Sequence, residues 1–306
     1  MGQNHGHGHG HGHSHGHGHA HVHSSTQNIK IAFFLNISFA LLEIAGGLMT
    51  NSVAILADAV HDLGDSLSLG LAWFLQNYSE RESNQQYTYG YGRFSLLGAL
   101  INAVILIAGS LWVLVEAVPR LLNPEASNAT GIVLLALVGI AVNGAAAFRL
   151  NSGNTLNERV ITWHLLEDVL GWVAVLIAGV LLLFFDVPII DPLLAILFTL
   201  YVLVNVLKNF RIAVSLFLQR VPSHISMDSL IQRFLQIEGV ESCHHLHIWS
   251  IDGDRNVLST HLVVDERSDR NDILRIKSAS KHIVHDLNVK HLTIEIEYAN
   301  EACHMA

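Results

Sequence analysis

Two histidine–aspartate pairs stand at the same spacing in two apolar stretches of the sequence. His61 and Asp65 are four residues apart in VHDLGDS, and the same spacing separates His164 from Asp168 in WHLLEDV. Residues at i and i+4 lie on one face of a helix, so each pair can present an imidazole and a carboxylate in one direction. Two such helices, facing each other, would supply two nitrogen and two oxygen ligands. This set suits Zn²⁺, whereas Mg²⁺ and Ca²⁺ prefer six or more oxygens.

The charged residues around these pairs are almost all acidic. An ionised side chain at the centre of a membrane span costs roughly 2.5–3.5 kcal/mol on insertion scales, so such residues usually have a function. Before Lys208, the apolar stretches contain basic residues only at two edges, Lys30 and Arg149. Buried carboxylates without a basic partner become protonated or bind a cation. The pattern therefore indicates a cation pathway and excludes an anion carrier.

Other acidic residues near the pairs have more than one interpretation. Asp58 shares a face with the first pair, and either contributes to the site or only caps, hydrogen-bonds or stays protonated. Asp62 and Glu167 point about 100° away from their neighbours in the pairs, so we expect them to contact other helices or water. Asn36 and Glu43 are seven residues apart, and either support the ligands or serve packing alone.

The elements that carry the pairs are predicted to be membrane helices. The chain has 306 residues, of which 51% are hydrophobic and 14% charged, against roughly a quarter charged in soluble domains. The formal charge of −9 argues against nucleic acid as a partner. Six stretches of about 20 residues are long enough to cross a lipid bilayer. They are 29–50, 53–76, 94–117, 130–149, 160–185 and 188–208, within a membrane domain expected at 29–213.

The basic residues predict the orientation of these spans. Arg120 alone falls on one side of the membrane. Eight others fall on the opposite side, and they are Lys30, Arg81, Arg93, Arg149, Arg159, Lys208, Arg211 and Arg220. Cytoplasmic loops carry an excess of Lys and Arg, so both termini are expected in the cytoplasm. The compact chain and short loops favour a bacterial inner membrane.

A small soluble domain is expected at 221–300, followed by a short tail at 301–306. Its pattern is a helix at 226–237, a strand at 240–251, a strand at 256–264, a helix at 269–287 and a strand at 289–298. The Asp252-Gly253 pair between the first two strands is typical of a β-hairpin turn.

Several of these stretches resemble one family. SVAILADAVHDLGDS and WHLLEDVLGW are similar to the second and fifth spans of the cation diffusion facilitator family. YGYGRFSLLGALINA resembles the segment leading into the third span, and HHLHIWSIDG resembles a strand of the family's cytoplasmic domain. The resemblance covers about 30–300. It implies six transmembrane helices followed by a small α/β, ferredoxin-like cytoplasmic domain that dimerises.

The same resemblance implies a function. The protein would be a homodimeric antiporter that moves Zn²⁺ out of the cytoplasm in exchange for protons, with His61, Asp65, His164 and Asp168 as its membrane site. Manganese-transporting relatives tend to carry Asp at the position of His61, so zinc is favoured, with cobalt or cadmium as secondary ions. The chemistry is consistent, because protons and Zn²⁺ compete for the same imidazole and carboxylate atoms.

A second metal site is expected in the soluble domain. Strand alternation places His244 on one face with Leu246 and Ile248, and places His245 and His247 on the other. The resemblance maps a cytoplasmic metal site of some relatives onto this region, and implies a set of His244, His261 and Glu297. The candidates to complete it are His291, Glu295, Cys303 and His304. Alternatively, these histidines lie on the surface or at a dimer contact.

Residues 1–28 are expected to be a disordered tail. Ten histidines alternate with small residues at 5–23, a composition that prevents a stable helix and binds metal. The tail would deliver zinc or buffer it.

Two other classes of function fit the sequence less well. A membrane-anchored zinc sensor or buffer leaves Asp65 and Asp168 unexplained. An intramembrane metalloenzyme needs an open metal position and a general base, whereas the four-ligand set is closed and the sequence has no HExxH motif. We therefore predict that the protein is not an enzyme.

Overall fold

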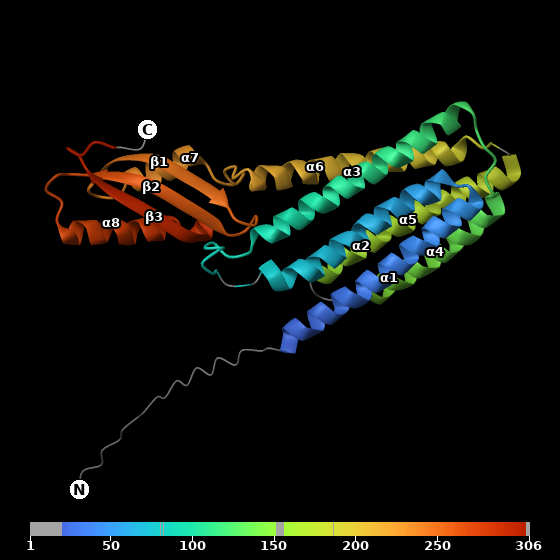
Figure 1. The fold of residues 1–306 in the computed structure, drawn as a ribbon, viewed down its shortest axis with the longest axis horizontal. Coiled ribbons are helices and arrows are strands. Elements are labelled where there is room, and N and C mark those ends of the chain that lie inside the picture. Colours follow the sequence, from blue (N-terminus) through green and yellow to red (C-terminus); the bar gives the residue numbers. More distant parts are fainter. Residues whose placement is uncertain (1–19, 80, 82, 151–155, 186, 304–306) are drawn as a thin grey trace, which may run out of the picture.

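The computed structural model describes residues 20–79, 81, 83–150, 156–185 and 187–303. Within these ranges, the side chains of 20–32, 72, 73, 76, 77, 79, 149, 150 and 156–164 lie outside the description. Six long helices are followed by a C-terminal α/β domain (Figure 1). The helices are α1 (Ala20–Thr50), α2 (Val53–Ser79), α3 (Arg93–Leu122), α4 (Ala129–Leu150), α5 (Leu156–Phe185) and α6 (Ile190–Phe217).

All six expected spans overlap these helices, but α1 begins at Ala20, so residues 20–28, which were expected to belong to a disordered tail, are helical. Within the described residues, α1, α3, α4, α5 and α6 are long and apolar enough to cross a membrane. The remaining helix, α2, has a similar length but carries three aspartates in its first half. It packs against α1, α3 and α6, and residues 52–59 are all buried. The most polar helix therefore lies inside the bundle.

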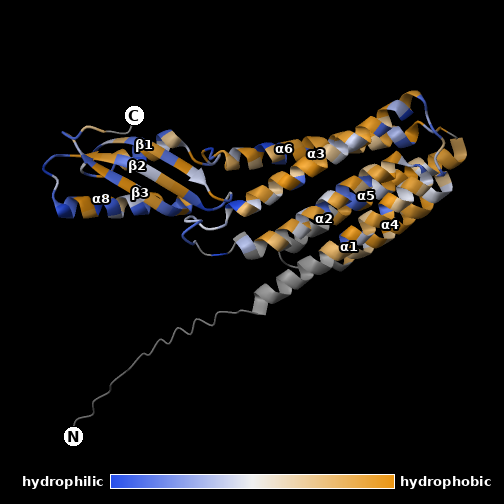
Figure 2. Ribbon diagram, in the orientation of Figure 1, coloured by the Kyte–Doolittle hydropathy of each residue, from blue (hydrophilic) through white to orange (hydrophobic). Residues whose placement is uncertain are grey.

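The outer surface of the bundle is apolar (Figure 2). Large side chains such as Met49, Val115 and Phe184 are 74–84% exposed. Such a surface is compatible with hydrocarbon and not with water. The prediction of an α-helical membrane protein is confirmed. α6 continues to Phe217, four residues past the expected end of the membrane domain at 213.

The end of α2 that lies far from the C-terminal domain, here called the distal end, is joined to α6. The Asp191 carboxylate accepts a hydrogen bond from Ser52 Oγ at 2.5 Å and another from the Val53 backbone N–H at 2.7 Å. The first N–H groups of a helix have no partner within that helix, and its N-terminus attracts negative charge. Asp191 thus caps α2 from another helix. Spacing within the sequence gave no indication of this role.

The C-terminal domain has the predicted α/β pattern. Its elements are α7 (Met227–Leu235), β1 (Val240–Ser250), β2 (Asn256–Val264), α8 (Arg270–Ile283), a 3₁₀ turn (His285–Leu287) and β3 (Val289–Tyr298). The sheet order is β1-β2-β3, with β1 antiparallel and β3 parallel to β2. Both helices contribute to one core with the sheet, centred on Phe234, Leu258, Leu262 and Ile276. The hairpin turn is confirmed, with Gly253 at φ 104°.

The predicted alternation of β1 is wrong around His244. A β-bulge interrupts the pairing with β2 between His244 and His247, and His245 adopts a left-handed conformation with φ 46°. An extra residue on one strand reverses the alternation on either side of it. Leu246 lies in the core, and Cys243 packs against the same core. His244 instead faces the opposite side of the sheet, where it approaches Glu297.

Candidate metal sites

The first predicted pair lies together on α2. His61 Nε2 is 3.6 Å from Asp65 Oδ2, and the two side chains are 19% and 23% exposed. The imidazole also makes an edge contact with the ring of Phe198 on α6, with the ring centres 5.8 Å apart. Because one helical turn separates the pair, both polar groups can bind one ion in the space beside α2.

The second predicted pair lies on α5, at the same depth. A Cβ at Gly171 of α5 would be 3.8 Å from Asp58 Oδ1 of α2, so these residues mark one level of the two helices. His61 and Asp65 follow Asp58 by three and seven residues, and Asp168 and His164 precede Gly171 by three and seven. The two helices run in opposite directions.

A rise of 1.5 Å per residue then displaces both pairs toward the C-terminal domain, by about 4.5 and 10.5 Å. His61 thus lies at the level of Asp168. The backbone of α5 places His164 at the level of Asp65, and the side chain of His164 lies outside the described residues. Positions occupied by histidine and by aspartate therefore alternate between the two helices within two turns.

Three more carboxyl groups surround this position. Glu43 of α1 and Asp58 and Asp62 of α2 are 0%, 6% and 5% exposed. Asp58 is close enough to Asp62, Asp168 and Asp65 for their charges to interact. Several buried carboxyl groups in one region favour the binding of protons or a cation there. Asp62 contacts another helix, as expected, because its side chain is close enough to Glu43 of α1 for the two carboxyl groups to interact.

Glu167 lies on the outer surface of α5, away from these acids. Its carboxylate accepts a hydrogen bond from Tyr201 Oη at 2.5 Å, and the ring of Tyr201 is exposed. This carboxylate is therefore adjacent to Asp168 in the sequence but lies on another face of the helix.

Close packing closes the distal side of the membrane site. Val53, Ala57, Val113, Ala117 and Ala195 form a buried cluster there. The cavity beside Asp58 has a volume of about 30 Å³, enough for one water molecule. His61 and Asp65, in contrast, are partly exposed. In this conformation the pair is more accessible than the residues on its distal side.

A second cluster of potential ligands lies on the C-terminal sheet. One ligand atom from each of His244, His261, Glu297 and Cys303 lies within 4.8 Å of all the others. His261 Nδ1 is 2.6 Å from Glu297 Oε1, and His244 Nε2 is 3.0 Å from Glu297 Oε2. Cys303 Sγ lies 4.0 Å from His261 Nδ1. Two imidazoles, a carboxylate and a thiol form a suitable tetrahedral set for Zn²⁺. We call this group the sheet cluster.

The electrostatics of the sheet cluster keep Glu297 ionised. Burial on its own would raise the pKa of Glu297, but hydrogen bonds from His261 and Cys303 and the neighbouring imidazoles lower it below its usual value. An ionised carboxylate is the form that binds metal. The other cysteine, Cys243, is on the core side of β1, where burial raises the pKa of its thiol.

The structure brings together the three ligands of the set expected in the C-terminal domain and one of the candidates to complete it. His244, His261 and Glu297 meet, and Cys303 joins them. His291 does not, because it lies six residues from Glu297 along β3, about 20 Å away, where its ring contacts Tyr89. Glu295 is exposed and lies 3.5 Å from His261 Nε2. His304 lies outside the described residues.

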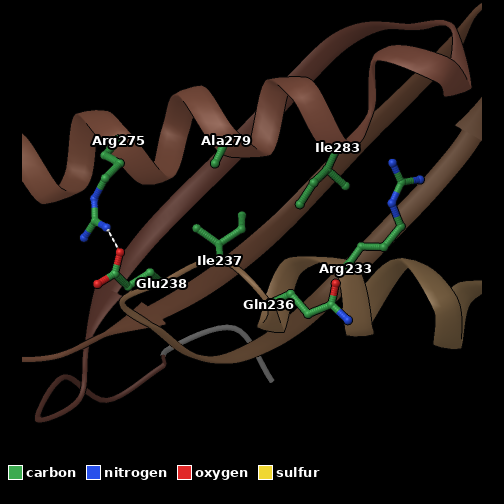
Figure 3. Close-up of a pocket in the computed structure, with 7 residues that line it drawn as sticks. All are labelled: Arg233, Gln236, Ile237, Glu238, Arg275, Ala279 and Ile283. Carbon is green, nitrogen blue, oxygen red and sulfur yellow. Dashed lines mark hydrogen bonds and ion pairs between the residues drawn. The ribbon is translucent and has the colours of Figure 1, made fainter.

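A groove between α7 and α8 is unsuited to metal. Its apolar surface is formed by Ile237, Ala279 and Ile283, and it has a volume of about 440 Å³ (Figure 3). The one carboxylate in its lining, Glu238, is paired with Arg275. The two candidate metal sites therefore lie elsewhere.

Comparison with known proteins identifies the family. A family model for the cation efflux transmembrane domain matches residues 29–218, and a model for the cation efflux protein cytoplasmic domain matches 222–299. The chain belongs to the cation efflux family. This is the cation diffusion facilitator family of the sequence resemblance, which is thus confirmed.

Curated relatives in the cation efflux family match over most of their length. A cadmium, cobalt and zinc/H⁺-K⁺ antiporter of Bacillus subtilis is 34% identical over 87% of each chain. The zinc transporter ZitB of Pectobacterium atrosepticum is 30% identical over 90% of this chain and 86% of its own. The metal cation efflux system protein CzcD of Cupriavidus metallidurans is 30% identical, covering 89% and 87%. Membership in this family makes the chain an integral membrane transporter of metal cations, in a family that is not a class of enzymes.

Proposed function

We propose that this protein exports Zn²⁺ from the cytoplasm in exchange for protons, with Co²⁺ or Cd²⁺ as secondary ions. His61 and Asp65 of α2, with His164 and Asp168 of α5, would bind the transported ion. The observation that carries this proposal is that Gly171 of α5 lies beside Asp58 of α2, lining the same small cavity, which supports matching levels for the two pairs on the two helices. The names of the zinc- and proton-linked relatives support the choice of ions.

Proton coupling follows from the chemistry of the ligands. Zn²⁺ binds neutral imidazole and ionised carboxylate, so binding displaces protons, and protonation releases the metal. Free imidazole titrates near pH 6.5, within the range that a transmembrane pH difference spans. The buried acids Glu43 and Asp58 increase the preference of this region for positive charge. A single site that is exposed to one side at a time then exchanges one ion for the other.

The orientation follows from the basic residues. Arg81 and Arg93 flank the loop between α2 and α3, which lies beside the C-terminal domain, whereas Arg120 is at the distal end and pairs with Glu116 and Glu125. The excess of basic residues on the side of the C-terminal domain supports a cytoplasmic location for both termini, in a membrane that we propose to be a bacterial inner membrane. The partly exposed His61 then faces the cytoplasm in this conformation.

The C-terminal domain would dimerise and bind a regulatory zinc ion. The match to a family model for the cytoplasmic domain supports dimerisation. Regulation is supported by the sheet cluster, in which His244, His261, Glu297 and Cys303 come from three strands and the C-terminal tail. A bound ion would join these elements, so cytoplasmic zinc would stabilise one arrangement of the domain.

The second candidate function is a membrane-anchored zinc sensor or buffer. The sheet cluster on its own would favour this function. A sensor or buffer function, however, does not explain the buried Glu43, Asp58 and Asp62 of the membrane helices, although burying carboxyl groups in a membrane is costly.

Zinc uptake into proteoliposomes under an imposed pH gradient separates the two functions. The wild type should take up zinc only with the gradient, and Asp65→Ala should not take up zinc. Glu167→Gln is the matched control, because Glu167 is a carboxylate in the same bundle that points away from the site. It should transport at nearly the wild-type rate. Tight zinc binding without gradient-driven uptake by the wild type would instead establish the sensor or buffer.

A further inference from the structure

His245 has an unusual backbone conformation beside the sheet cluster. Its φ of 46° lies in the left-handed region, which residues with a side chain adopt infrequently. It occupies the β-bulge between His244 and His247. Bulges of this kind are common next to functional sites, where they redirect a side chain. The bulge therefore determines where the imidazole of His245 lies.

The bulge brings three imidazoles together. In a regular strand His244 and His245 would point to opposite faces of the sheet. Here their ring centres are only 5.2 Å apart, and the ring of His245 lies 5.1 Å from that of His261. The ring centres of His244 and His261 are 5.3 Å apart. The three rings thus form a nearly equilateral triangle.

These separations match those of three histidines around one metal ion. A Zn–N bond is about 2.0–2.1 Å long, and the ring centre lies a little over 1 Å beyond the nitrogen. Three imidazoles at tetrahedral angles then have ring centres about 5.2 Å apart. By contrast, the rings of His245 and His247 are 6.5 Å apart and lie at 27° to each other. The triangle includes His245 and excludes the next histidine of the strand.

We propose that His245 is a further ligand of the cytoplasmic metal site, in which it takes the fourth position as an alternative to Cys303. Zn²⁺ in protein sites usually has four ligands, and with His245 the sheet cluster offers five. In this structure Cys303 contributes to the close set of ligand atoms. The His245 ring is half-buried and lies outside the close set of ligand atoms, so a rotation about its side-chain bonds would have to bring one of its nitrogens to the same centre.

Two donor sets follow from this exchange. With Cys303 the ion has two nitrogens, one oxygen and one sulfur. With His245 it has three nitrogens and one oxygen, and the C-terminal tail is released. The set with the Cys303 thiolate favours soft ions, whereas the set of three imidazoles and one carboxylate also suits Co²⁺. This inference rests on the regulatory metal site proposed above and does not depend on transport.

The test uses Co²⁺ bound to the otherwise full-length protein in detergent, followed by its absorption spectrum and by calorimetry. Every variant carries Asp65→Ala and Asp168→Ala and lacks residues 5–23, so that neither the membrane site nor the histidine tract binds the probe. In this parent protein we expect visible cobalt bands together with a thiolate-to-cobalt charge-transfer band in the near ultraviolet.

The variants distinguish the two fourth ligands. Cys303→Ser should lose the charge-transfer band but keep the visible bands, because His245 takes the position. His245→Asn should keep both bands, since Cys303 remains. The double variant should bind Co²⁺ at least about tenfold more weakly than either single variant. Asn tolerates the left-handed conformation, and His245→Gly should behave in the same way without strain.

Several results would overturn the inference. One is a double variant that binds as tightly as Cys303→Ser alone, because His245 then contributes nothing. Another is loss of all binding in Cys303→Ser, because His245 then cannot replace the thiolate. The matched control is His247→Asn, which should leave the spectrum unchanged with and without Cys303→Ser. If His247→Asn had the same effect as His245→Asn, both substitutions would act by disturbing the strand and not by removing a ligand. If the parent protein bound no Co²⁺, the C-terminal domain would have no regulatory metal site, and the proposal for the membrane site would not be affected.

Discussion

The membrane site and the sheet cluster use the same kinds of side chain, but the chain assembles them differently. In the bundle, each half of the site is a single helical turn, His61 with Asp65 on α2. In the C-terminal domain the members come from β1, β2, β3 and the tail, and His244 is 53 residues from Glu297. The first site depends on local spacing, whereas the second depends on strand register.

The surroundings of the two sites differ in the same sense. Buried acids such as Glu43 and Asp58 accompany the membrane pair, and their interactions with a mobile ion change when it leaves. Glu297 of the sheet cluster is held in its ionised form by hydrogen bonds from His261 and Cys303. The first arrangement suits an ion that must be released, and the second suits an ion that remains bound.

The largest expected effect comes from removing a membrane ligand. Asp168→Ala should reduce gradient-driven zinc uptake by roughly 100-fold or more, because losing even an indirect contact to a metal ligand commonly costs 10–100-fold. Uptake in proteoliposomes measures the loss. The control is zinc bound by the C-terminal domain of the same variant, which should not change. Normal uptake by Asp168→Ala would show that the proposed transport site is wrong, and that the two regions do not differ in the way described above.

Removing a ligand of the sheet cluster should weaken zinc binding there and leave the membrane site intact. His261→Ala removes the central member of the sheet cluster, so zinc affinity at that site should fall by about tenfold or more. Calorimetry on the purified protein should then show one ion fewer per chain, with the membrane site still filled. Loss of both ions would show that the two sites are not independent.

Exchanging one ligand should shift ion preference by several-fold. His61→Asp replaces a nitrogen ligand with an oxygen ligand, which suits Mn²⁺ better than Zn²⁺. The ratio of manganese to zinc uptake, measured side by side, should rise. His245→Asn, a change of a histidine in the other region, should leave that ratio unchanged. If His61→Asp also leaves it unchanged, His61 does not select the ion.

The smallest effect concerns the hairpin that sets the register of the sheet cluster. Burial would raise the pKa of Asp252, but hydrogen bonds from the Arg255 and Asp254 backbone N–H groups and from the Arg255 guanidinium lower it overall. Its stabilisation is therefore fully present above the unfolded pKa of about 3.9 and is lost as pH falls through the lower folded value.

Asp252→Asn should accordingly lower the stability of the C-terminal domain by about 1 kcal/mol at pH 7, since Arg255 is partly exposed. The difference in Tm from the wild type should shrink as the pH is lowered below 4. A difference that is constant with pH would mean that the Asp252 charge does not stabilise the turn.

The same contrast explains how much the sequence could predict. The two HxxxD pairs, all six helices and the order of elements in the C-terminal domain follow from patterns of period 3.6 or 2 within single segments. The bulge at His245 does not, because an extra residue in a strand is visible only against its partner strand. His244 was consequently assigned to the wrong face, and His291 to a cluster that it does not reach.

Asp191 shows the same limit inside the bundle, because the helix that it caps begins 138 residues earlier. Its position has a mechanical consequence. If α2 moved away from α6 at the distal end, the Val53 amide and the Ser52 hydroxyl would lose their buried acceptor. The two helices are therefore joined to each other at that end. A rearrangement that keeps this cap intact must therefore move the distal ends of α2 and α6 together.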